Sequence, residues 1–351
     1  MNRMMIAGLA VLATLAAMAG AQTPDPAASG WVNVTNNVGG PKWGDYAIHM
    51  LTCAPGKDTD VVIAGVPGTG LWSSTDGGAK WNKLGGEGKT QITSRPTSMV
   101  WDPANPKVCW VTAIYGAGLF KTVDGGESFE PVGNLQHIDS VAVDFSDPER
   151  KLMLICKHET PRSLAKSTDG GKTWETIGKN LPENTNHTTN SVIIDPKTYL
   201  VNCAGWLRGT TSGIYRTEDG GATWTKVNDQ GPSGRPLVTA DGAIYWQGGG
   251  LLKSTDKGKT WNKLGGPVRS NVVEAPAGSK LGGKDGAIMG WSDKGIYASR
   301  DGGSTWTALS AKLPIKPNAA AYDAKRNCVF ISQMQAKQIT DAIWRLDLPN
   351  N

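Results

Sequence analysis

Short apolar runs separated by polar turns recur along almost the whole chain. In one stretch, runs at residues 98–101 and 108–114 are joined by the turn Asp-Pro-Ala-Asn-Pro, and another run follows at 118–120. Runs of this length bounded by Gly, Pro and Asp are typical of β-strands and are too short for helices. The pattern predicts an all-β protein built from many short strands.

An octapeptide of the form Ser/Thr-x-Asp-x-Gly-x-x-Trp/Phe follows such runs six times, with its Asp residues 37 to 50 positions apart. The Asp residues are Asp76, Asp124, Asp169, Asp219, Asp256 and Asp301. Asp accepts hydrogen bonds from nearby backbone N–H groups, and Gly adopts the positive φ that a tight hairpin turn needs. We therefore interpret each copy as a hairpin turn whose aromatic residue anchors the next strand. Four short strands in a unit of about 45 residues predict a β-propeller blade.

The end of the chain supplies an incomplete seventh unit. After the sixth octapeptide, apolar runs at 319–322, 328–332 and 342–345 predict three strands rather than four. Residues 31–34, Trp-Val-Asn-Val, match the segment that begins with the octapeptide Trp elsewhere, for example Trp-Asn-Lys-Leu at 81–84. We expect this N-terminal strand to complete the last blade and close the ring, which removes exposed strand edges. The sequence thus predicts a single seven-bladed β-propeller over residues 30–348, with six such hairpins.

The octapeptide and its spacing resemble those of the Asp-box (BNR) repeat proteins. These include sialidases, xyloglucanases, sortilin-type receptors and a photosystem assembly factor of the thylakoid lumen. The resemblance covers nearly the whole of residues 30–348 and implies that the box hairpins lie on the face opposite the ligand-binding face, so that their Asp residues are structural. A true sialidase is not expected, because the Arg-Ile-Pro signature before the first box is absent and no Tyr–Glu pair is placed as the nucleophile. Xyloglucanases place their cleft between two propellers, whereas this chain has one.

Composition and charge narrow the class of protein further. The 351 residues include 45 Gly, which disfavours a mainly helical protein, and the formal net charge of +5 gives no case for nucleic-acid binding. Residues 1–21 combine a positive end, a long apolar segment and Ala-Gly-Ala, which is the pattern of a secretory signal peptide cleaved after Ala21. Residues 22–29 are a short linker. We expect a secreted or periplasmic monomer that does not bind membranes.

The five cysteines give no metal or redox motif. They are Cys53, Cys109, Cys156, Cys203 and Cys328. The odd number leaves at least one free thiol, and most of them lie in apolar runs where Cys acts as a small core residue. No CxxC and no Cys/His pair with metal-ligand spacing occurs. The sequence predicts neither a metal site nor a cofactor.

Candidate ligand-binding residues gather at one end of the predicted central channel. The starts of the first strands and the loops between second and third strands should meet there, and they carry all four His residues of the chain together with several Arg and Trp residues. The predicted substrate-binding residues are His49, Arg95, Tyr115, Trp206, Arg235, Trp246, Arg269 and Trp291. Arg matches carboxylates and aromatic faces stack on sugar rings, so this set favours an anionic or polyhydroxylated ligand over an ordinary solvated rim.

Catalysis at this end would need two carboxylates, or a His with a carboxylate, facing each other. Asp139 and Glu159 are the preferred pair, because both belong to the third blade beside His137 and His158. A lyase that uses His137 or His158 as the base on a uronic-acid substrate fits the same residues. Two structural alternatives stay open: Asp139 caps the start of a strand, and Glu159 pairs with Arg162.

Two functions therefore compete. The first is a secreted carbohydrate-active enzyme, glycosidase-like or a lyase, that acts on a neutral or acidic glycan. The second is a non-catalytic propeller that binds a glycan or an exported protein. Compact blades favour the second function, because enzymes of this fold carry long loop insertions, whereas the clustered His, Arg and Trp residues favour a ligand site in either case.

Overall fold

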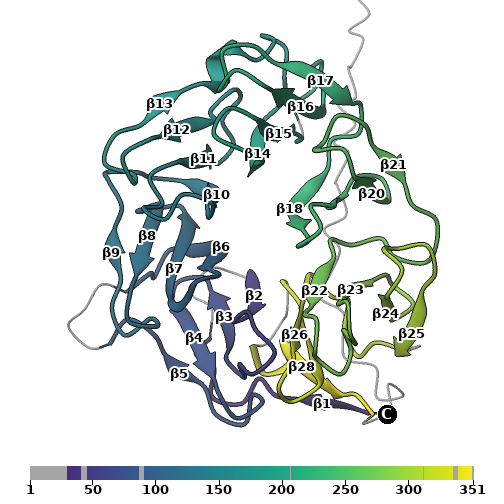
Figure 1. Ribbon diagram of the computed structural model, residues 1–351. Coiled ribbons are helices and arrows are strands. Elements are labelled where there is room, and N and C mark those ends of the chain that lie inside the picture. Colours follow the sequence, from purple (N-terminus) through teal and green to yellow (C-terminus); the bar gives the residue numbers. More distant parts are fainter. Residues whose placement is uncertain are drawn as a thin grey trace, which may run out of the picture.

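The computed structural model describes residues 30–40, 46–86, 91–205, 207–310, 312–334 and 339–349. Within these residues, 28 strands form seven antiparallel sheets of four strands each, arranged as a ring around a central channel (Figure 1). The predicted all-β, seven-bladed propeller is confirmed. The helical elements of the described residues are two short 3-10 helices, η1 (Gly178–Asn180) and η2 (Ile339–Asp341). The described residues contain no helix that is long and apolar enough to cross a membrane.

Each blade is a meander of four strands, numbered outward from the channel. Blade 1 contains β2 (Met50–Cys53), β3 (Val62–Val66), β4 (Gly70–Ser74) and β5 (Asn82–Lys83). Blade 2 contains β6 (Arg95–Asp102), β7 (Asn105–Ile114), β8 (Leu119–Thr122) and β9 (Glu130–Pro131). Blade 3 contains β10 (Ile138–Val143), β11 (Met153–Lys157), β12 (Ala165–Ser167) and β13 (Glu175–Thr176). Blade 4 contains β14 (Thr188–Ile193), β15 (Tyr199–Cys203), β16 (Gly213–Thr217) and β17 (Thr225–Asn228).

The remaining blades complete the ring. Blade 5 contains β18 (Ser233–Val238), β19 (Ile244–Gln247), β20 (Leu251–Ser254) and β21 (Asn262–Lys263). Blade 6 contains β22 (Val273–Ala275), β23 (Ala287–Trp291), β24 (Ile296–Ser299) and β25 (Thr307–Ser310). Blade 7 contains β26 (Ala319–Asp323), β27 (Cys328–Ser332), β28 (Ile343–Asp347) and β1 (Trp31–Asn33).

The N-terminal strand closes the ring, as predicted. Strand β1 pairs with β28, with Trp31 opposite Leu346, and the two lie together beside the C-terminus (Figure 1). The Trp31 indole Nε1 donates hydrogen bonds to Ser310 Oγ and to the Lys312 carbonyl, at 3.1 and 3.0 Å. Because Ser310 belongs to blade 6, this buried side chain also joins the closing strand to the neighbouring blade.

The Asp boxes have the hairpin chemistry expected of them. In the first box, Ser74 Oγ accepts a hydrogen bond from the Gly78 N–H at 2.9 Å and donates to Asp76 Oδ1 at 2.8 Å. The same carboxylate accepts from the Lys80 N–H at 2.9 Å, and Gly78 has a φ of +87°. These hydrogen bonds lower the pKa of Asp76 and stabilise its charged form. The same bonds recur in the other five boxes, so the box carboxylates are engaged by their own turns.

Apolar side chains fill the spaces between neighbouring blades. The box residues Trp81 and Phe129 are each 1% exposed, and Trp81 Nε1 donates to the Val34 carbonyl at 2.8 Å. All five cysteines are free thiols, four of them buried and Cys53 half-buried. Burial raises the pKa of Cys109 and Cys203 to about 12, as expected for small core residues rather than reactive thiols.

The strand order fixes which loops share an end of the channel. The first strand of each blade lies innermost, and the antiparallel second strand returns to the end at which the first began. The starts of first strands and the loops after second strands therefore lie at one end, which we call the mouth. The Asp boxes, which follow third strands, lie at the opposite end.

Candidate functional site

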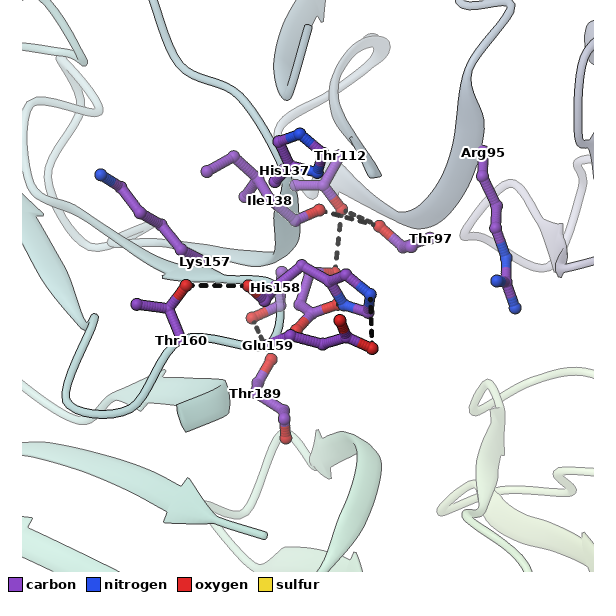
Figure 2. Close-up of polar contacts among 12 residues, drawn as sticks. Arg95, Thr97, Thr112, His137, Ile138, Lys157, His158, Glu159, Thr160 and Thr189 are labelled. Carbon is purple, nitrogen blue, oxygen red and sulfur yellow. Dashed lines mark hydrogen bonds and ion pairs between the residues drawn. The ribbon is translucent and has the colours of Figure 1, made fainter. Parts of the chain in front are cut away.

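Five of the predicted site residues meet at the mouth where blades 2 and 3 adjoin. They come from the loop after β7 (Tyr115), the start of β10 (His137 and Asp139) and the loop after β11 (His158 and Glu159). Figure 2 shows His158 and Glu159 close together, with His137 above them. The contacts thus bring these five predicted residues together at one place.

Hydrogen bonds join three of these side chains into a chain. His158 Nδ1 lies 2.8 Å from Asp139 Oδ1, and His158 Nε2 lies 3.2 Å from the Tyr115 hydroxyl. With Nδ1–H donating to the carboxylate, neutral His158 has Nε2 available as an acceptor, so that the Tyr115 hydroxyl donates to it. Glu159 Oε1 lies 3.5 Å from the same Nε2. Both predicted carboxylates therefore contact one imidazole.

The start of β10 is held so that Asp139 faces His158. The β10–β11 register shifts between Ile138 and Ser140, which leaves Asp139 outside the regular ladder; such bulges re-aim side chains. Hydroxyls of blade 2 hold the displaced backbone: Thr97 Oγ1 donates to the Ile138 carbonyl and Thr112 Oγ1 to that of Asp139, each at 3.1 Å (Figure 2). Blade 2 thus orients a carboxylate of blade 3.

Three residues of the cluster have left-handed backbone conformations that non-Gly residues rarely adopt. The φ angles are +60° at Tyr115, +55° at His137 and +50° at Glu159. Local contacts support this arrangement: the Tyr115 N–H donates to His137 Nδ1 at 3.1 Å, and the Tyr115 ring packs edge-on against His137 and His158. Such conformations are unfavourable and gather at ligand sites. Three of the eight non-Gly residues with a positive φ among the described residues thus lie in this cluster.

Arg95, at the start of β6, adds a positive charge to this site. Its guanidinium stacks over the Tyr46 ring at 4.2 Å and contacts Met334 Sδ at 3.6 Å, and its Nε is buried with no hydrogen-bond partner among the described residues. No carboxylate of the described chain forms an ion pair with it. In the view of Figure 2, Arg95 lies on one side of His158 and Lys157 on the other. The guanidinium is therefore available for an anion.

The charges of the site act on one another. The hydrogen bond to Asp139 raises the pKa of His158, and the Glu159 charge adds to this. Burial and the Glu159 charge raise the pKa of Tyr115, and the positive charge of Arg95 opposes both shifts. His49 differs: burial, and then the Arg95 charge, lower its pKa to about 4, while its Nδ1 donates to the Pro96 carbonyl at 2.9 Å. At neutral pH, His49 is a neutral group beside a cation.

The other two predicted Arg residues do not join Arg95. Arg235 and Arg269 line the central channel, a cavity of about 870 Å³. His49 and Trp291 also line this cavity, whereas Arg95 does not. Arg235 reaches across the channel from β18 to the carbonyl of Met99 in β6, and desolvation by the surrounding channel walls lowers its pKa to about 10, which leaves it cationic at neutral pH. Arg269 donates to the carbonyls of Gly266 and Val268, in its own loop. The structure thus separates a mouth site from a channel lining.

Two predicted Trp platforms need separate comment. Trp246 is fully buried, packs against Trp261 and donates from Nε1 to the Gly234 carbonyl at 2.9 Å. The prediction that Trp246 stacks on a ligand is therefore wrong, because β19 turns this side chain into the space between blades. Trp206 lies outside the described residues, as do the predicted signal peptide and linker.

Comparison with protein families agrees with the fold. The profile of the DUF6242 β-propeller domain matches residues 173–349, just over half of the chain, and the BNR/Asp-box repeat profile matches residues 165–176. The chain belongs to the DUF6242 β-propeller family. The expected Asp-box propeller is thereby confirmed by both sequence and structure.

Relatives of this DUF6242 propeller include glycan-degrading enzymes. The chain is 25% identical over 328 residues to a xyloglucanase of Paenibacillus sp, and 24% identical over 327 residues to a xyloglucanase of Hypocrea jecorina. These matches cover 83% and 80% of the chain but only 29% and 35% of the relatives, so the chain spans about a third of their length. Among solved structures, YCF48 bound to D1 peptide is similar over 94% of this chain and 100% of its own, with a TM-score of 0.55 and 16% identity.

One feature of the mouth cluster is not predicted by the sequence. Tyr115 was assigned to ligand binding alone, although its hydroxyl extends the pair formed by Asp139 and His158. The positions of the two residues indicate the contact, because Tyr115 follows the second strand of blade 2 and His158 follows the second strand of blade 3. Loops at equivalent positions of neighbouring blades lie side by side, so such pairs are the first to inspect in a propeller sequence.

Proposed function

We propose that this propeller is a carbohydrate-active protein that binds an acidic glycan at the mouth between blades 2 and 3 and cleaves it there. The observation that carries the proposal is the hydrogen-bonded series Asp139–His158–Tyr115, which lies beside the Arg95 guanidinium, a cation with no carboxylate partner among the described residues. A hydrogen-bonded carboxylate, imidazole and hydroxyl form a unit that moves protons, and Arg binds carboxylates through its paired N–H groups. The distant xyloglucanase relatives support a glycan as the ligand.

The second candidate function is binding without catalysis. The single compact propeller and its likeness to YCF48, a structure with a bound peptide, favour a glycan- or protein-binding role of that kind. In that case the mouth cluster would be a recognition surface. The two functions differ in whether a bound glycan is cleaved.

Binding and cleavage are tested together on a panel of polygalacturonate, alginate and hyaluronan, with neutral xyloglucan for comparison. The purified protein should bind an acidic member, and the reaction should release new reducing ends. Arg95→Gln should weaken this binding about tenfold or more, as expected for loss of a charged hydrogen-bond partner, whereas Arg95→Lys should retain part of it.

Arg300→Gln is the matched control, since Arg300 belongs to the end of blade 6 that bears the Asp box and donates to the Leu281 carbonyl. It should bind like the parent protein. Preference for xyloglucan over every acidic glycan, or equal binding by the Arg95→Gln variant, would contradict an acidic ligand at Arg95. Binding without new reducing ends would support the second candidate function.

A further inference from the structure

Resting on the proposed function, we infer that Tyr115 is the catalytic residue of the mouth site and that the reaction is β-elimination on a uronic-acid residue. His158 then exchanges protons with the Tyr115 hydroxyl, Asp139 positions His158, and Arg95 binds the uronate carboxylate. The juxtaposition of an exposed phenol, a paired imidazole and a cation carries this assignment.

Tyr115 is the most exposed of the three hydrogen-bonded side chains, and Glu159 beside them is also exposed, at 49%. Tyr115 is 43% exposed, whereas the side chains of His158 and Asp139 are 19% and 17% exposed. Of these three side chains, a ligand at the mouth therefore meets Tyr115 first, and His158 lies behind it with Nε2 directed to the phenol oxygen. Proton exchange with the ligand runs through Tyr115 rather than directly through the imidazole.

This role requires a protonated Tyr115 and a neutral His158, a state that His158 reaches as the pH rises above its raised pKa. Partial desolvation and the neighbouring Glu159 charge raise the pKa of Tyr115 above its ordinary value, so the phenol is protonated at neutral pH and needs an acceptor before it can act as a base. Neutral His158 is that acceptor, because its Nδ1–H is already committed to Asp139. The resulting imidazolium would lie between two carboxylates, at 2.8 Å from Asp139 and 3.5 Å from Glu159, which stabilise its charge.

The carboxylates are poorly arranged for hydrolysis. Glycoside hydrolysis uses two carboxyl groups on opposite sides of the scissile bond, about 5–10 Å apart. Asp139 and Glu159 instead both contact His158, and Asp139 receives its Nδ1–H. The His158 imidazole thus lies between the two carboxylates, in the place where hydrolysis would need the scissile bond.

Arg95 supplies the feature that elimination requires. The hydrogen on C5 of a uronate lies next to the carboxylate, and its removal builds negative charge on that group. A guanidinium bound to the carboxylate stabilises this charge. Arg95 is suited to this position because it lies beside the cluster, acts electrostatically on both Tyr115 and His158, and has no ion-pair partner among the described side chains.

The step balances without any co-reactant. As the Tyr115 proton passes to His158 Nε2, the phenolate oxygen takes the C5 proton of the uronate. The C5–H electron pair forms the C4–C5 double bond, and the C4–O bond breaks with its electrons going to the leaving oxygen. Tyr115 then gives its proton to that oxygen, and His158 returns a proton to Tyr115. The products are an unsaturated uronate and a new hydroxyl end, and the protein is unchanged.

The test measures unsaturated uronate by its ultraviolet absorbance, alongside reducing ends, on polygalacturonate, alginate and hyaluronan. The parent protein should form both products in equal amounts on the glycan that it binds. Tyr115→Phe should lower the rate about 100-fold or more, the usual contribution of a positioned acid–base group, while glycan binding stays within twofold. Tyr297→Phe in β24 is the matched control, since the same hydroxyl is lost in blade 6 rather than in the cluster of blades 2 and 3, and it should react like the parent protein.

A second variant distinguishes positioning from mere structural support. Asp139→Asn should lower the pH at which the rate rises, because His158 must be neutral to accept the Tyr115 proton and Asp139 raises its pKa. If Asp139→Asn lowered the rate but left the pH–rate profile unchanged, this would contradict the role given to Asp139 in positioning His158.

The remaining outcomes separate this inference from the proposed function. Reducing ends without unsaturated uronate, or parent-like rates in Tyr115→Phe, would overturn elimination but leave glycan cleavage at the mouth intact. Binding without any product would overturn both the elimination and the cleavage. Absence of binding to every acidic glycan of the panel would overturn the proposed function itself.

Discussion

Asp139 and His158 are joined by a hydrogen bond of 2.8 Å between Oδ1 and Nδ1, which links the first strand of blade 3 to the loop after its second strand. The bond fixes the orientation of the imidazole, so that its other nitrogen faces the Tyr115 hydroxyl. The mouth site is thus ordered from the channel wall outward, from carboxylate to imidazole to phenol.

The first prediction concerns the titration of His158. Asp139→Asn should lower the His158 pKa, because the hydrogen bond to Asp139 is the largest cause of its raised value and an amide stabilises imidazolium less well. Glu159→Gln is the matched control and should lower this pKa less, since the Glu159 charge is a smaller cause. An NMR titration of the His158 ring protons measures both. A larger shift in Glu159→Gln would contradict the assigned pairing.

The same pair predicts a pH-dependent stability. A His whose folded pKa is raised contributes stability that is fully present below its unfolded pKa, about 6.5, and is lost as the pH rises through the folded value. Asp139→Asn should therefore reduce the free energy of unfolding by about 1–2 kcal/mol at pH 5.5 and by less at pH 8.5. Urea denaturation at the two pH values measures the difference. An equal loss of unfolding free energy at both pH values would show that the charge of His158 does not strengthen its bond to Asp139.

His49 should act in the opposite sense. Its pKa is lowered to about 4, so protonation is easier in the unfolded chain than in the folded one. Stability is complete above pH 6.5 and falls as the pH drops toward 4. The loss between pH 7 and pH 4.5 should be about 2 kcal/mol smaller in His49→Gln than in the parent protein. Urea denaturation of both proteins at the two pH values measures this difference, and a value near zero would contradict the desolvated, neutral state of His49.

The sequence predicted the scaffold well because repetition supplies the same information several times. One octapeptide is a weak signal, but six copies at regular spacing fix the hairpin, the blade and the orientation of every loop. Even ring closure was predictable, since the Trp31 segment repeats the strand that follows a box.

The site was harder to predict because its geometry depends on neighbouring blades. The bulge that aims Asp139 is held by Thr97 and Thr112, two hydroxyls with no distinctive pattern in the sequence. For Trp246, the sequence correctly places the residue near a mouth loop but does not show where its side chain points. The side chain follows the pleat of the strand into the core. Backbone periodicity places a residue on an element, whereas packing decides which way it faces.

The Asp box offers a sharp test of hairpin energetics. Thr122 is 2% exposed, and its hydroxyl accepts the Gly126 N–H at 3.0 Å and donates to Asp124 at 2.7 Å. Thr122→Ala should lower the free energy of unfolding by about 2 kcal/mol, because a buried N–H loses its acceptor. Thr122→Ser keeps the hydroxyl and is the matched control, with a loss below about 1 kcal/mol. Glycan binding should be unchanged in both variants, and equal losses would show that the methyl group rather than the hydroxyl matters.

Ring closure depends most strongly on Trp31. Its indole is 8% exposed, packs in the core between blades 6 and 7, and donates to Ser310 and to the Lys312 carbonyl. Trp31→Ala should lower the free energy of unfolding by about 3–5 kcal/mol, the usual cost of removing a buried aromatic residue. Val32 is the matched control, since it lies on the same strand but is 47% exposed, and Val32→Ala should cost less than about 0.5 kcal/mol. Urea denaturation measures both variants. If Trp31→Ala were no less stable than Val32→Ala, the closing strand would contribute little to holding the ring together.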